Sequence, residues 1–177
     1  MILSVCPNPS VDCTIELDTL KTGSLNRIDN KVITYSGKAL NVAIGVARLG
    51  GESFATGFMF EENGKMFVHC LDDEKVKNTF VWSKGSARTN YKIVDKRAMM
   101  TEINDKGEPV SLQKQAELVS LVSQLSSSAS IAVISGSLPS GVKPEYYRQL
   151  SKAVNPNAKK ISSRRCNRRS SRSNGRA

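Results

Sequence analysis

The chain has 177 residues, of which 39% are hydrophobic and 24% charged, so it can bury the core of one ordinary domain. This composition argues against a disordered chain, and no apolar run approaches the roughly 18 residues of a membrane-spanning helix. The first residues lack the basic start and long apolar run of a signal peptide, so we expect a cytoplasmic protein. The four cysteines form no C-x-x-C pair and His69 is the single histidine, which argues against a metal site or a disulfide framework.

The net charge of +10 is concentrated in the last residues of the sequence. Residues 162–177 contain six arginines and no acid, and removing those six leaves +4 for residues 1–161. We expect this Arg/Ser-rich tail to be disordered, since it cannot bury an apolar face. Three interpretations are open: a basic arm for nucleic acid, a solvated low-complexity end, or the product of a shifted reading frame. We favour the shifted frame, because arginine usage changes abruptly inside an apparent element, and we do not expect a nucleic-acid partner.

Strand-like and helical segments alternate along residues 1–161. In chain order we expect strands over 2–5, 11–17 and 27–35, a helix over 39–49, a strand over 53–58, a helix over 64–71, strands over 79–82, 89–94 and 98–103, a helix over 112–125, a strand over 131–134 and a helix over 144–154. This alternation predicts an α/β fold with a mainly parallel sheet and flanking helices.

Three of these segments carry more detailed expectations. The helix over 39–49 is apolar nearly all round, so we expect it to be well buried. Ser111 is expected to cap the helix that follows it, and Pro144 to lie in the first turn of the last helix.

A glycine-containing loop, Ser36-Gly37-Lys38-Ala39, leads into the first expected helix. Unpaired N–H groups and the positive end of a helix dipole suit an anion such as a sugar phosphate, and Lys38 adds positive charge. The loop is not a Walker A motif, because Val32 and Ala39 stand where that motif needs Gly and Ser or Thr. An ordinary strand-to-helix turn is the alternative.

Three other places could contact such a ligand. The small residues around Ser137 follow an expected buried strand, at the end where open α/β sheets place their sites; a tight turn without a ligand is the alternative. Asp12 could accept hydrogen bonds from substrate hydroxyls, and the planar fork of Arg88 could bind a phosphate. Alternatively, both are solvated surface charges.

These segments occur in a familiar order. The series runs through Cys6–Asp12, Gly23–Arg27, Ser36–Ala43, Arg88–Asn90, Thr101–Asn104 and Ser135–Val142. Over residues 1 to about 161 the chain resembles the N-terminal half of PfkB (ribokinase-like) carbohydrate kinases, most closely the branch of 1-phosphofructokinase and tagatose-6-phosphate kinase. Each motif is modest alone, but their order and spacing together are specific.

The resemblance implies a site for a sugar phosphate. Its expected substrate-binding residues are Asp12 for the hydroxyls, Gly37, Lys38 and Asn41 at the helix start, Arg88 for the phosphate, and Ser137 beside the sugar. The extended pieces at about 12–35 and 88–103 would form the family's small β-lid, through which two subunits can form a homodimer. With ATP and Mg²⁺, such an enzyme phosphorylates fructose 1-phosphate, tagatose 6-phosphate or fructose 6-phosphate to the bisphosphate.

Two departures from the family pattern qualify this expectation. Ser36 and Ala39 replace two glycines of the family loop Gly-Gly-Lys-Gly, at a cost of about 1 kcal/mol wherever that backbone needs a positive φ. The Gly-Ala-Gly-Asp motif, which supplies the catalytic base and an anion hole, is absent, and the nucleotide-binding half would follow it. We therefore expect a truncated hexose-phosphate kinase with no catalytic residue, little of an ATP site and no activity alone. The alternative is a non-catalytic module that binds sugar phosphates or dimerises.

Overall fold

The computed structural model describes residues 1–163; the rest of the Arg/Ser-rich tail, with the interpretations that concern it, lies outside the described residues. In chain order the elements are β1 (Ile2–Cys6), β2 (Ser10–Leu17), β3 (Asn30–Ser36), α1 (Lys38–Arg48), β4 (Ser53–Phe60), α2 (Gly64–Asp73), β5 (Lys77–Asn78), β6 (Val81–Ser83), β7 (Arg88–Asp95), β8 (Met100–Asn104), α3 (Leu112–Leu125), the short 3₁₀ turn Ser126–Ser128, β9 (Ile131–Ser135), α4 (Tyr146–Ala153) and β10 (Lys159–Ser163).

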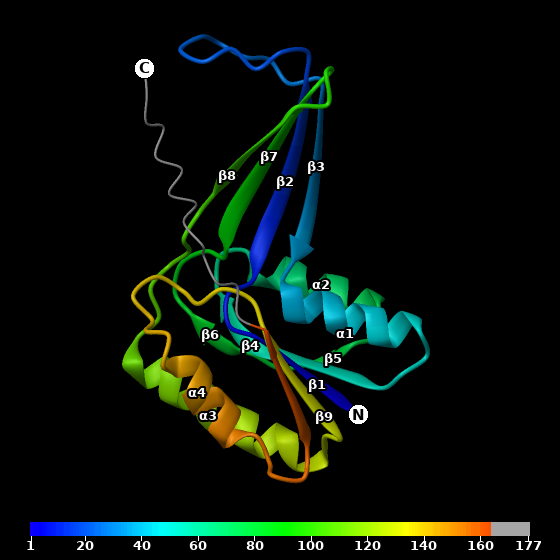
Figure 1. Ribbon diagram of the computed structural model, residues 1–177, viewed down its shortest axis with the longest axis vertical. Coiled ribbons are helices and arrows are strands. Elements are labelled where there is room, and N and C mark those ends of the chain that lie inside the picture. The colour runs from blue at the N-terminus through cyan, green and yellow to red at the C-terminus, as the bar shows by residue number, and fades with distance from the viewer. Residues whose placement is uncertain (164–177) are drawn as a thin grey trace, which may run out of the picture.

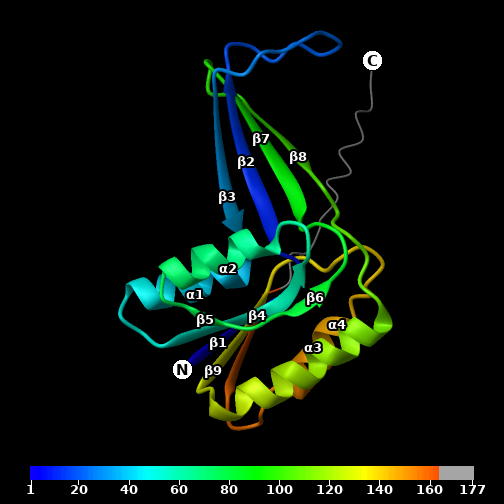
Figure 2. The ribbon, with the colours of Figure 1, turned by 180° about the vertical axis from the view of Figure 1, so that it is seen from behind.

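The main sheet is parallel throughout, in the order β10-β9-β1-β4-β5, and β6 pairs with the last residues of β4. Helices α1 and α2 cover one face and α3 and α4 the other (Figures 1 and 2). Leu3, Ser4 and Val5 are fully buried, as expected for a central strand covered on both faces. The predicted fold class is confirmed.

A second sheet of four strands, which we call the lid, projects from this body along the long axis of the molecule (Figures 1 and 2). Its order is β3-β2-β7-β8. The central strands β2 and β7 are parallel, and each pairs with its outer neighbour in the antiparallel sense. The lid is therefore assembled from two hairpin-like pieces that lie far apart in the sequence.

Two helix expectations were wrong in detail. Only one stripe of α1 is buried, formed by Ala39, Leu40 and Ala43, because the helix packs on the sheet with a single face; Val42 is 36% exposed. Helix α4 begins at Tyr146, and Pro144 lies in the turn before it. The expected cap of α3 is confirmed, since the Ser111 hydroxyl accepts a hydrogen bond from the Lys114 N–H at 3.2 Å.

Some strands begin or end at other residues than expected, because their bounds depend on pairing with strands that are distant in the sequence. The strand expected over 79–82 was wrong in its bounds: residues 79 and 80 lie between β5 and β6, which pair with separate parts of β4, and only residues 81 and 82 belong to β6. Ala98 has a φ of 61° in the turn before β8, so that strand begins later than expected. Strand β10, which no expected segment covers, adds an edge beside β9 and includes Ser162 and Ser163.

Within residues 1–163, no helix is both long enough and apolar enough to cross a membrane. Cys6, Cys13 and Cys70 are free thiols.

Candidate functional site

A cavity of about 640 Å³ lies where the lid meets the carboxyl ends of β1 and β9. All six substrate-binding residues predicted from the sequence line it, although they come from four separate segments. The lining residues are Asn8, Ser10, Asp12, Ser36, Gly37, Lys38, Asn41, Arg88, Asn90, Lys92, Glu102, Asn104, Gly136, Ser137, Leu138, Val142, Pro144 and Tyr147.

The register of the lid strands gives the lid one polar and one apolar face. Asp12 stands opposite Thr34 of β3 and Asn90 of β7, and Asn90 stands opposite Asn104 of β8. Residues paired in this way point to the same face of a sheet, and neighbours along a strand point to opposite faces. The next row, Ile33–Cys13–Tyr91–Ile103, therefore faces away from the cavity.

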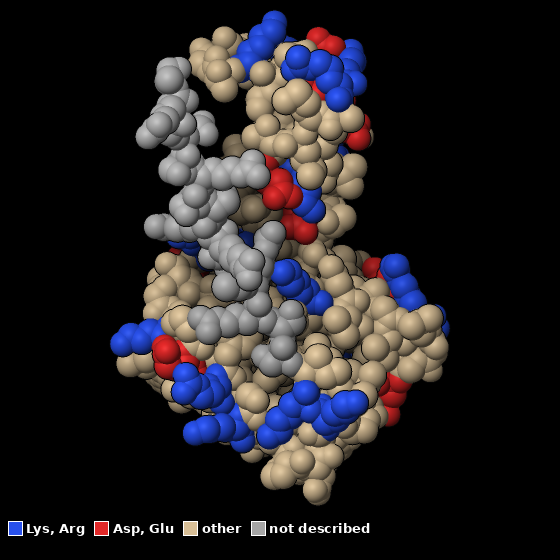
Figure 3. All heavy atoms as spheres, in the orientation of Figure 1, with Lys and Arg blue, Asp and Glu red and all other residues tan. Residues whose placement is uncertain are grey.

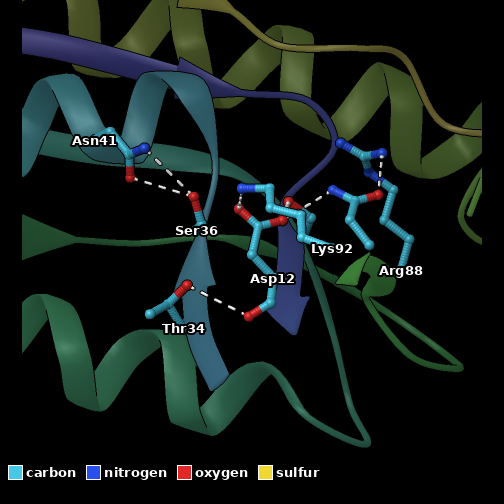
Figure 4. A network of polar contacts seen from close by, with 8 residues as sticks. Asp12, Thr34, Ser36, Asn41, Arg88 and Lys92 are labelled. Atoms are coloured by element: carbon cyan, nitrogen blue, oxygen red, sulfur yellow. Dashed lines mark hydrogen bonds and ion pairs between the residues drawn. The ribbon is translucent and has the colours of Figure 1, made fainter. Parts of the chain in front are cut away.

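A chain of hydrogen bonds joins the acidic and basic groups of the polar face (Figure 4). Asp12 Oδ1 accepts from Asn90 Nδ2 at 2.9 Å and from Ser10 Oγ at 3.3 Å, and Asp12 Oδ2 lies 3.9 Å from Lys92 Nζ. Asn90 Oδ1 accepts from Arg88 Nη1 at 3.0 Å. Figure 3 shows acidic and basic atoms beside one another near the base of the lid. The site thus holds charges of both signs at fixed positions.

Arg88 is half-buried and only partly hydrogen-bonded. Its Nη1 also donates to the Asp105 carbonyl oxygen at 3.2 Å, but Nε is buried without an acceptor among the described residues. Burial lowers the pKa of the guanidinium, and the nearby charge of Asp12 opposes that shift. The guanidinium remains a cation with unused donor capacity, which an anion could satisfy.

The start of α1 has no side chain that caps it. Gly37 is the N-cap residue, and no acidic residue lies in the first turn, so the positive end of the helix dipole is not neutralised from within α1. A Cβ on Gly37 would lie 2.6 Å from Cys6 Sγ, which explains why glycine is needed there. Ser36 and Ala39 do not have a positive φ, so the two departures from the family loop carry no such backbone cost.

Asn8, which the sequence analysis did not single out, holds together loops at the cavity through side-chain hydrogen bonds. It is 2% exposed, and its Nδ2 donates to the Lys106 and Leu138 carbonyl oxygens at 3.3 and 3.1 Å and to Ser137 Oγ at 3.2 Å. One side chain therefore connects the end of β1 to the loops that follow β8 and β9. The motif around Asp12 contains Asn8, but only the tertiary structure shows which loops it joins.

Cys6 and His69 are poor candidates for reactive groups. Burial raises the pKa of the Cys6 thiol to about 11, although backbone N–H groups of Asn8, Leu40 and Ala39 oppose the shift, so the thiol is neutral at physiological pH. His69 lies on the exposed surface of α2, with Nε2 3.7 Å from Asp73 Oδ2.

The described residues offer no preformed set of protein ligands for Mg²⁺. No group of three or more His, Cys, Asp or Glu side chains that could hold a metal ion occurs in the part of the chain that the structure covers. The sequence also contains no Gly-Ala-Gly-Asp motif. The cavity therefore offers groups for a polar anionic ligand.

The chain is similar to solved sugar-phosphate kinases. A possible 1-phosphofructokinase from Thermotoga maritima is 29% identical, with a TM-score of 0.77 over 92% of this chain and 53% of that protein. Phosphofructokinase-2 from Escherichia coli in complex with fructose-6-phosphate is 28% identical, with a TM-score of 0.80 over 91% of this chain and 54% of that protein. The tetrameric inhibited form of the same enzyme matches with a TM-score of 0.81 and 27% identity over 91% of this chain and 53% of that protein.

These comparisons also show how much of a kinase the chain represents. It spans about half the length of each of these solved proteins. Residues 8–170 match the family described as pfkB family carbohydrate kinase, which is most of the chain. The chain therefore belongs to the pfkB family of carbohydrate kinases.

Proposed function

We propose that the cavity binds a hexose phosphate and that Arg88 takes its phosphate group. The observation that carries this proposal is the half-buried Arg88 guanidinium in the cavity lining, of which only Nη1 donates hydrogen bonds among the described residues. Phosphate oxygens in the cavity would accept charge-assisted hydrogen bonds from the remaining terminal donors of this guanidinium. The planar fork of arginine matches the geometry of phosphate, which supports this ligand class.

The sugar would lie between the lid and the start of α1. Asp12 would accept hydrogen bonds from its hydroxyls, since Oδ2 has no hydrogen-bond donor among the described residues and lies near Lys92 at 3.9 Å. Asn41, Lys38 and the backbone at Gly37 would contact it from the helix start. Ser137 would approach from the loop after β9. Groups on opposite walls would then fix the orientation of the sugar.

The reaction to which this binding belongs is ATP-dependent phosphorylation of a hexose phosphate to the bisphosphate. The family and the relative solved with fructose-6-phosphate support this reaction class. Phosphoryl transfer depends on a positioned base and on stabilisation of charge, and the Gly-Ala-Gly-Asp motif that supplies them in the family does not occur in this sequence. We therefore propose that this chain alone binds the sugar phosphate without transferring a phosphoryl group, as a non-catalytic binding module also would.

Titration of the 177-residue chain with fructose 1-phosphate, tagatose 6-phosphate and fructose 6-phosphate tests the binding. We expect at least one to bind saturably and to stabilise the fold by about 2.7 kcal/mol at 100 times its Kd, measured by thermal or chemical unfolding. With ATP and Mg²⁺ added, no bisphosphate should form. Unchanged unfolding with all three ligands would contradict the binding, and formation of bisphosphate would contradict the proposed inactivity.

We also propose that two copies of the chain pair through the apolar face of the lid. Ile33, Tyr91 and Ile103 are 45%, 40% and 56% exposed, and they form one row across the sheet with the buried Cys13. Such a contiguous apolar row is a typical interaction surface. The tetrameric form of the Escherichia coli relative supports self-association of this kind.

A charge in this row should dissociate the pair. Ile103→Lys is expected to convert a dimer into a monomer, because an unpaired ammonium would be buried in the apolar interface; sedimentation velocity measures the change. Leu112→Lys is the matched control, since Leu112 is 82% exposed at the start of α3, outside the lid, and should leave the dimer intact. A monomeric wild-type chain, or an Ile103→Lys variant that stays dimeric, would rule out this interface.

A further inference from the structure

We propose that Asn90 is a positioning residue that couples the phosphate-binding Arg88 to the hydroxyl-binding Asp12; this role rests on the hexose-phosphate binding proposed above. Its amide lies between the two charged groups. Oδ1 accepts a hydrogen bond from Arg88 Nη1 at 3.0 Å, and Nδ2 donates one to Asp12 Oδ1 at 2.9 Å. The ligand-binding cation and the ligand-binding anion are thus oriented by one neutral side chain.

The position of Asn90 favours an indirect role over direct contact. Asn90 is only 9% exposed, whereas Arg88 and Asp12 on either side of it are more open to the cavity. Strands β7 and β2 are parallel and in register, so Asn90 lies directly opposite Asp12. Arg88 precedes it by two residues and therefore lies on the same face. Asn90 can set the orientation of both neighbours while presenting little surface to a ligand.

An amide is suited to this position because it offers a neutral acceptor at one end and a donor at the other. A carboxylate would satisfy Arg88 but would repel Asp12, and an alanine would leave both partners without their hydrogen bond. Asn90 and Ser10 together hold Asp12 Oδ1, which leaves Oδ2 for a ligand. The bond to Arg88 uses Nη1, which leaves Nη2 of the guanidinium for phosphate.

The variant Asn90→Asp tests this arrangement through pH. The charged groups on the surrounding elements are Asp12 on β2, Arg88 and Lys92 on β7, Glu102 on β8 and Lys38 at the start of α1. The carboxylate introduced at position 90 would lie beside that of Asp12, and repulsion between the two raises the pKa of the introduced group. Below that pKa the shared proton supplies an O–H donor to one carboxylate, and the remaining carbonyl oxygen accepts from Arg88. The protonated variant therefore reproduces the hydrogen bonds of the amide.

The measurement is the ratio of variant to wild-type Kd for the tightest-binding of fructose 1-phosphate, fructose 6-phosphate and tagatose 6-phosphate, by calorimetry from pH 5 to pH 8. Ionisation of the ligand phosphate changes the Kd of both proteins by the same factor, so it cancels in this ratio. For Asn90→Asp we expect a ratio of about tenfold or more at pH 8, as for loss of a hydrogen bond to a charged group, falling towards one at pH 5. Asn90→Ala should show a similar loss that does not change with pH.

A second measurement needs no titration. If Asn90 orients both groups, Asn90→Ala should weaken the binding of inorganic phosphate and of unphosphorylated fructose alike, whereas a residue that touches one part of the ligand would affect one of them. A pH-independent ratio for Asn90→Asp, or wild-type affinities in Asn90→Ala, would overturn the positioning role while the hexose-phosphate site stands. A wild-type chain that binds none of the three hexose phosphates would overturn the proposed function and this role with it.

Discussion

Replacing Arg88 by methionine is expected to weaken hexose-phosphate binding about a hundredfold, the effect of losing two charge-assisted hydrogen bonds to phosphate. Methionine keeps the apolar stem and removes the guanidinium. The phosphate group should then add nothing to affinity, so the variant should bind fructose 1-phosphate no better than fructose. Calorimetric titration with both ligands measures this difference. Stability without ligand should change little, because the loss of two hydrogen bonds is offset by removal of a buried Nε that has no acceptor among the described residues.

Two further variants separate the shape of the group from its charge. Arg88→Lys keeps the charge without the planar fork, so we expect an affinity between those of wild type and Arg88→Met. Arg48→Met removes an arginine that pairs with Glu74 outside the cavity lining, and it should leave binding unchanged. If Arg88→Met retained wild-type affinity for all three hexose phosphates, the phosphate would have to bind elsewhere.

Much of the fold was predictable because its signals are local. The uninterrupted apolar run of β9 and the capping serine of α3 both reflect short-range preferences, and the structure confirms them. The break between β5 and β6, which falls at residues 79 and 80 of the strand expected over 79–82, depends on which residues of β4 the two strands meet, and that is a tertiary property. Likewise, the apolar pattern of α1 does not show that only one of its faces meets the sheet.

The candidate site likewise has features that the sequence predicts and others that only the tertiary structure shows. Residues at the ends of parallel strands and at a helix start could be nominated from the sequence, because such ends meet at one edge of a sheet. The structure places Asp12, Arg88 and Ser137 around one cavity, while their roles remain predictions. Asn90 could not be assigned a partner, since Asp12 lies 78 residues away and only the register of β2 and β7 brings the two together.

The glycine at position 57 should be the least replaceable residue of the main sheet. Gly57 has a φ of +150° and stands opposite Cys6 in the parallel pair of β1 and β4. An added Cβ would lie 1.9 Å from the Cys6 carbonyl oxygen, so two central strands would have to separate. Backbone strain and overpacking together lead us to expect that Gly57→Ala lowers the free energy of unfolding by about 3 kcal/mol or more. Urea denaturation measures the loss as a lower midpoint.

The chain offers a matched glycine for this test. Gly45 lies within α1, and a Cβ there would have no atom within 4 Å, so Gly45→Ala is expected to stabilise the protein by about 1 kcal/mol through helix propensity alone. The same chemical change should therefore act in opposite directions at the two positions, which separates a steric effect at β1 from any general effect of alanine. Equal midpoints for Gly57→Ala and the wild type would show that β1 and β4 can move apart without cost. Because Asn8 follows β1 closely and braces the loops around the cavity, a destabilised Gly57→Ala should also bind hexose phosphate more weakly.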